Sequence, residues 1–197
     1  MGKGPDGPGI IIALLKVDNG KITTLKTLTM PRNNLVVPDF YRPYIALVEQ
    51  DDVNTALRKT NKKFRKFLKD LPEKKVDYAY AEGKWTLKEV LQHVIDAERV
   101  FGYRALWFAR KDTQPLPGFD ENAWAVHADV SGRKWDNMID EFKMLRRSTE
   151  HLFDSFTEEE LKASGTSNNK VINVEAIGYI CAGHVAHHIK IIKERYL

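Results

Sequence analysis

Apolar residues recur three and four positions apart through most of this chain, from about residue 43 to its end. That spacing places them on one face of an α-helix, and it repeats in four long segments separated by breaks. The four apolar faces are Val53, Leu57, Thr60, Phe64, Phe67 and Leu71; Leu87, Val90, Leu91, Val94, Phe101, Ala105 and Phe108; Trp135, Met138, Phe142, Leu145, Thr149, Leu152 and Phe156; and Val174, Ile177, Cys181, His184, His188, Ile191 and Arg195. The pattern predicts an all-α protein built as a four-helix bundle.

Local signals define where these helices begin and end. Thr86 with Glu89, and Thr157 with Glu160, have the spacing of a capping box, in which each side chain accepts a hydrogen bond from a free N–H at a helix start. Pro72 ends the first helix. Residues 113–124 contain two prolines and a glycine, which predicts a loop with a short helix after Asp120. Residues 164–169 are expected to form a loop, and the last helix to run from about 173 to 196.

The first 38 residues differ from the rest. Their opening is rich in glycine and proline, and two apolar runs then flank Asp18-Asn19-Gly20, a sequence that suits the tight turn of a β-hairpin. A flexible or non-native extension is the alternative, because an isolated two-stranded hairpin is only marginally stable. The expected organisation is therefore an extension over residues 1–38 and a helical bundle over residues 39–197.

Composition and charge exclude several classes of protein. With 43% hydrophobic and 29% charged residues among 197, the chain has the balance of one folded domain. The net charge of +4 is mild, and the basic residues between 58 and 75 avoid the apolar face, so we expect a solvated helix surface and no nucleic-acid binding. No apolar run is long enough to cross a membrane. The single cysteine excludes an internal disulfide, and we expect a cytoplasmic protein.

Two histidines occupy core positions of the last helix. His184 and His188 are one helical turn apart, a spacing that allows two imidazoles to bind one metal ion. A buried polar group without a partner costs roughly 1–3 kcal/mol, and a metal would satisfy both rings. The pair alone is weak evidence, since a core histidine is more often hydrogen-bonded. His93 lies at the border of the second apolar face and could supply a third ligand, which would leave a coordination position open as in catalytic sites.

The remaining histidines and the cysteine are weaker candidates. His187 is rotated about 100° from the apolar face, so it is expected to be exposed or to support the ligands from outside. His127 and His151 have no partner pattern. Cys181 precedes His184 by three residues and could approach the site, but a small core residue is the favoured interpretation.

Three segments resemble the DinB-like superfamily: GKWTLKEVLQHVIDAERVF at 83–101, GHVAHHIKIIKERYL at 183–197, and LPGFDENAW at 116–124, which is similar to a loop of the YfiT-like branch. The likeness covers residues 39–197. It implies a DinB-like four-helix bundle, commonly a homodimer, with one divalent ion per chain, zinc or nickel, on His93, His184 and His188. The branch includes thiol S-transferases that use bacillithiol as well as metal-dependent hydrolases.

Three neutral imidazoles would leave the charge of a divalent ion uncompensated, so the ion would acidify a bound thiol or water. The expected function is transfer of a low-molecular-weight thiol, as a metal-bound thiolate, to a small electrophilic substrate. A hydrolase using activated water and a non-catalytic metal-binding stress-response protein are the alternatives. Asp120 and Glu121 are candidate catalytic carboxylates and Trp124 is a candidate substrate-lining residue; alternatively, Asp120 caps a helix and Trp124 fills the core.

Overall fold

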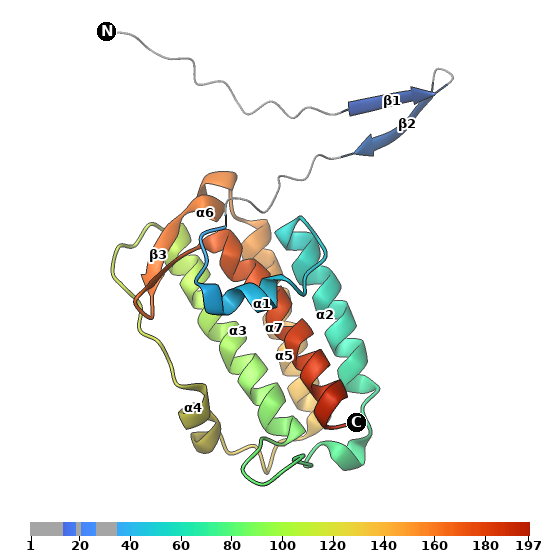
Figure 1. Cartoon of the computed structure of the whole chain (residues 1–197), viewed down its shortest axis with the longest axis vertical. Helices are drawn as coiled ribbons and strands as arrows, with labels where there is room; N and C mark the ends of the chain where they lie inside the picture. Colours follow the sequence, from blue (N-terminus) through green and yellow to red (C-terminus); the bar gives the residue numbers. More distant parts are fainter. Residues whose placement is uncertain (1–13, 19–20, 27–34) are drawn as a thin grey trace.

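Four long helices form the body of the computed structural model, which describes residues 14–18, 21–26 and 35–197 (Figure 1). They are α2 (Val53–Lys69), α3 (Leu87–Ala109), α5 (Trp135–Asp154) and α7 (Val174–Arg195). Helices α7 and α5 each pack against both α2 and α3, so the successive helices α2 and α3 lie diagonally across the bundle. This arrangement confirms the predicted all-α four-helix bundle.

The predicted helix starts are confirmed by their hydrogen bonds. Thr86 begins α3 and Thr157 begins the short helix α6 (Glu158–Lys162), and both capping boxes are complete. The side chain of Asn173 accepts a hydrogen bond from the backbone N–H of Ala176 at the start of α7. A cap of this kind contributes about 1 kcal/mol. Among the described residues, no helix is long and apolar enough to cross a membrane.

Short elements cover the sides of the bundle. They are η2 (Asp39–Tyr41), α1 (Arg42–Ile45), η3 (Glu73–Lys75) and α4 (Glu121–His127). The α1 turn lies across α7, and the two backbones approach so closely that a Cβ atom at Gly183 would lie 2.1 Å from the carbonyl oxygen of Tyr44. Glycine at 183 therefore permits α1 to pack directly beside His184.

One predicted loop is a β-hairpin instead. Strand β3 (Ser164–Ser167) pairs antiparallel with β4 (Lys170–Asn173), so residues 164–169 form a strand and most of a tight turn. Asn168 and Asn169 both have positive φ, 49° and 58°, which asparagine adopts more readily than most residues. The prediction of a loop was therefore wrong. Each strand is only four residues long, too short for an alternating pattern to reveal it, although the Asn168-Asn169 pair is typical of a tight turn.

A second hairpin lies in the N-terminal segment. Strands β1 (Leu14–Asp18) and β2 (Lys21–Lys26) pair antiparallel, with an irregularity in register between Lys16 and Val17. The two strands agree with the predicted hairpin, while its expected turn at Asn19-Gly20 lies outside the described residues.

A buried arginine that the helical spacing did not predict joins all four long helices. Arg146 of α5 is fully buried and donates two hydrogen bonds to the carboxylate of Glu98 in α3, at 2.6 and 2.8 Å. It also donates to the carbonyl oxygen of Cys181 in α7 at 2.8 Å and to the Thr60 hydroxyl in α2 at 3.4 Å. Nearly all of its hydrogen-bonding capacity is therefore used within the core.

We predict that Glu98→Gln destabilises the protein by about 3–5 kcal/mol, because the substitution removes the carboxylate that is ion-paired and hydrogen-bonded to the buried Arg146 charge. The free energy of unfolding in urea measures this. The control is Asp154→Asn, which breaks an exposed ion pair with Arg58 and should cost less than about 1 kcal/mol. Equal, small losses in the two variants would contradict the assigned role of the buried pair.

Candidate metal centre

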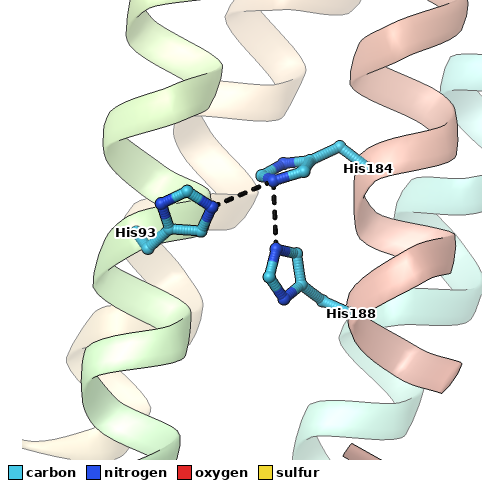
Figure 2. Close-up of side chains that lie close together, drawn as sticks. All are labelled: His93, His184 and His188. Carbon is cyan, nitrogen blue, oxygen red and sulfur yellow. Dashed lines mark hydrogen bonds between the residues drawn. The ribbon is translucent and has the colours of Figure 1, made fainter. Parts of the chain in front are cut away.

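Three histidine side chains converge between α3 and α7 (Figure 2). His93 projects from α3, and His184 and His188 project from successive turns of α7. The Nε2 atom of His184 lies 3.0 Å from the Nε2 atoms of both His93 and His188. His184 and His188 are buried and His93 is partly buried. These three residues are those that the sequence singled out.

The three rings cannot satisfy one another by hydrogen bonding. A ring nitrogen of a neutral imidazole carries either one hydrogen or one lone pair. The Nε2 atom of His184 can therefore complete only one of its two close contacts. The Nδ1 atom of His188 is also buried without a hydrogen-bond partner. The cluster is thus incomplete as a hydrogen-bonded group.

A divalent cation fits this donor set. Zinc–nitrogen bonds of about 2.0–2.1 Å at tetrahedral angles place two nitrogens roughly 3.3 Å apart, close to the 3.0 Å contacts found here. All three candidate ligand atoms lie within 4.8 Å of one another. In the part of the chain that the structure describes, this is the one cluster of three or more such side chains, and it contains no carboxylate or thiolate.

Burial keeps the three imidazoles neutral. It lowers the pKa of His93 from 6.5 to about 4, against a smaller opposing effect of Glu121. Burial also lowers the pKa of His184 and of His188 well below the usual value, and the neighbouring histidines add to the effect. Neutral imidazole is the form that binds metal, so the site is prepared for a cation at neutral pH.

Aromatic rings fix the orientation of the histidines. Tyr44 and Phe101 both meet the His184 ring edge-on, with centroids 5.6 and 6.0 Å away. Trp85 lies 5.0 Å from the His93 ring. None of these three was predicted as a site residue. Phe101 was assigned to an apolar face, and nothing in the chain's spacing indicated that Tyr44 would reach α7.

A cavity of about 310 Å³ opens beside the cluster. Aromatic side chains from η2, α1, α3, the residue before its N-cap and the loop before α4 form its walls. Two charged side chains, Arg104 and Glu121, also line it. The lining residues are Phe40, Tyr41, Tyr44, Trp85, His93, Ala97, Phe101, Arg104, Gly118, Phe119, Glu121, Asn168, His184, His187 and His188. A concave chamber that combines aromatic walls with convergent polar groups is suited to bind a small molecule.

The three candidate residues between Asp120 and Trp124 have different surroundings in the structure. Asp120 caps α4 by accepting hydrogen bonds from the backbone N–H groups of Asn122 and Ala123, as one of the two interpretations expected. Glu121 lines the cavity together with His93. Trp124 is 43% exposed and packs on Phe119, so the alternative interpretation that it fills the core was wrong. It covers a small hollow beside His93 instead.

The weaker candidates are also located. His187 is half-buried, lies against the rings of Tyr44 and His188, and lines the cavity. His127 and His151 are exposed and do not belong to the cluster. Cys181 is a buried core residue, and burial raises the pKa of its thiol well above the usual value.

Comparison with known proteins identifies the family. The DinB superfamily model matches residues 56–192, and the chain belongs to that superfamily. It is 29% identical over 128 residues to an Oceanobacillus iheyensis protein named "Putative metal-dependent hydrolase", covering 62% of this chain and 71% of the relative. A Geobacillus thermodenitrificans protein of the same name is 28% identical over 75 residues, covering 38% and 42%.

Two solved structures share the fold. YfiT from Bacillus subtilis, described as "a probable metal-dependent hydrolase with an unusual four-helix bundle topology", aligns with a TM-score of 0.61 and 19% identity over 84% of this chain and 90% of its own. A mycothiol-dependent maleylpyruvate isomerase aligns with a TM-score of 0.57 and 12% identity over 70% and 58%. At these identities the likeness concerns the fold.

We predict that the stability of metal-free protein falls as the pH drops from about 6.5 toward 4. Over this range the unfolded chain protonates its histidines while the folded cluster resists protonation, so acid favours unfolding. Melting temperatures of wild type and His93→Gln between pH 7.5 and 4.5 test this, and the variant should show the weaker pH dependence. His151→Gln, at an exposed site, should behave as wild type; an unchanged pH profile for His93→Gln would contradict the prediction.

Proposed function

We propose that this protein is a metal-dependent enzyme that transfers a low-molecular-weight thiol to a small electrophilic substrate. The observation that carries the proposal is the convergence of three neutral imidazoles at the wall of a cavity large enough for a small molecule. His93, His184 and His188 would hold one divalent ion, zinc or nickel, with no anionic protein ligand. Bound there, such an ion supplies a positive charge that favours the thiolate form of a coordinating thiol.

The residues of this chain supply the surroundings for that chemistry. The rings of Tyr44, Trp85 and Phe101 restrict water around the cluster and hold the imidazoles in place. Glu121 offers a carboxylate on the cavity wall that can accept the proton released by the thiol. Asp120 positions Glu121, because the two hydrogen bonds that Asp120 accepts fix the start of the helix that carries Glu121.

The thiol assignment is supported by a fold relative whose name states that it depends on mycothiol, a small thiol. Hydrolysis with metal-activated water is the second candidate, and the names of the two curated relatives favour it. Both reactions use the same three histidines, the same open position and the same carboxylate. They differ in the nucleophile, so the choice of nucleophile is what an experiment must decide.

The first prediction from this proposal concerns metal content. Protein purified without added metal should contain about one divalent ion per chain, and His184→Ala should lose most of it because one of three ligands is removed. Elemental analysis by mass spectrometry measures the content. The matched control is His151→Ala, at an exposed position, which should keep the metal. Equal metal in both variants would refute the site.

The second prediction concerns turnover. A panel of low-molecular-weight thiols with monochlorobimane should give a fluorescent product at a rate that depends on both thiol and metal. Glu121→Gln should slow the reaction by roughly 10²-fold or more at neutral pH if Glu121 accepts the proton. His188→Ala should reach the uncatalysed rate. Metal-dependent cleavage of an ester or amide without any thiol turnover would establish the hydrolase instead.

A further inference from the structure

Two arginines are buried in this bundle, and only one of them is paired with a carboxylate among the described residues. Arg146 is paired with the Glu98 carboxylate, as described above. Arg104 of α3 is 6% exposed, yet among the residues that the structure describes no carboxylate forms an ion pair with it. Its Nη2 atom donates one hydrogen bond to the carbonyl oxygen of Pro117 at 2.9 Å, and its side chain also reaches the Tyr41 hydroxyl.

Such a group is unusual in energetic terms. A guanidinium has five N–H donors and a full positive charge, and the cost of burying that charge is normally offset by a counter-ion. One carbonyl and one phenol leave several donors of Arg104 unused. The Phe119 ring beneath it, 5.8 Å from the guanidinium carbon, offers further stabilisation but no anion. The described part of the chain therefore supplies no negative charge to Arg104, which suits this side chain to bind an anionic ligand.

The position of Arg104 indicates where that anion would lie. Arg104 follows His93 by eleven residues, about three turns of α3, so the two side chains share one face of the helix. Both line the same cavity. Helical side chains generally lean toward the N-terminus of their helix, and His93 lies on the N-terminal side of Arg104 in α3. A ligand that touches both ends needs a length on the order of 10 Å.

We propose that Arg104 anchors a carboxylate of the substrate while the reacting atom lies at the His93–His184–His188 cluster. The substrate class is then a small molecule with a carboxylate at one end and an apolar body against Tyr41 and Phe101. A single guanidinium matches the planar fork of a carboxylate. The Glu121 carboxylate in the same cavity disfavours a doubly charged phosphate. The inference rests on the proposed function only in locating the substrate in this cavity.

The direct test measures binding to metal-free protein, so that the metal cannot supply the anion site and no turnover is needed. The probes are 4-phenylbutanoate and its neutral amide, measured by isothermal titration calorimetry. Wild type should bind the acid at least about tenfold more tightly than the amide, as expected for a charge-assisted hydrogen bond. Arg104→Gln should abolish the preference, and Arg104→Lys should retain part of it.

Arg110→Gln is the matched control, since Arg110 ends the same helix, is exposed and pairs with Glu160. It should keep the wild-type preference, and circular dichroism should show that all variants are folded. Equal affinity of wild type for acid and amide, including no measurable binding of either, would overturn the proposal. So would a preference that survives in Arg104→Gln.

A second experiment identifies which reactant carries the carboxylate. With metal-loaded protein, N-acetylcysteine and its amide are compared as thiols, and 4-(bromomethyl)benzoate and its amide as electrophiles. Arg104→Gln should raise KM about tenfold for the carboxylate form in one pair and leave the amide form unchanged. The pair whose KM changes identifies the reactant, thiol or electrophile, whose carboxylate binds Arg104. Turnover with no response in either pair would overturn the proposal, whereas absence of turnover in wild type would refute the proposed function and leave the binding result intact.

Discussion

The arrangement of this bundle depends on the ion pair between Arg146 and Glu98. Through its guanidinium, α5 is hydrogen-bonded to α2, α3 and α7 at one level of the core. Hydrogen bonds have strict directions, whereas apolar contacts tolerate sliding, so the pair specifies how far each helix is shifted along its neighbours. Glu98 follows His93 by five residues and Cys181 precedes His184 by three. The pair therefore sets the relative heights of the two helices that carry the histidines.

The sequence was sufficient to predict the helices and the His184–His188 pair, because both rest on short-range periodicity. His93 was only a possible third ligand by its position, and the resemblance to the DinB-like superfamily assigned it to the set. Three- and four-residue spacing identifies a buried face, and a polar residue on that face stands out. The same criterion could have identified the two buried charges. Glu98 lies on the apolar face of α3, between Val94 and Phe101. Arg146 lies on the apolar face of α5, beside Phe142 and Thr149. The predicted apolar faces omitted them since charged residues are usually exposed.

Other features depend on contacts between distant segments, which spacing does not encode. Tyr44 reaches α7 only because α1 crosses that helix. Arg104 becomes a cavity residue only because the loop before α4 packs against it at Pro117 and Phe119. The β3–β4 hairpin shows a related limit. Its strands are too short for an alternating pattern to be distinguished from a loop, although the Asn168-Asn169 turn is a recognisable signal.

The contact at Gly183 sets the position of one wall of the cavity. Tyr44 belongs to the cavity wall, and its backbone rests where a side chain at position 183 would otherwise be. Position 183 adjoins His184 in sequence but is not part of the cluster. A methyl group there would lift the α1 turn from α7 while leaving the three imidazoles on their helices. A substitution at this position would thus change the size of the cavity without altering any residue that lines it.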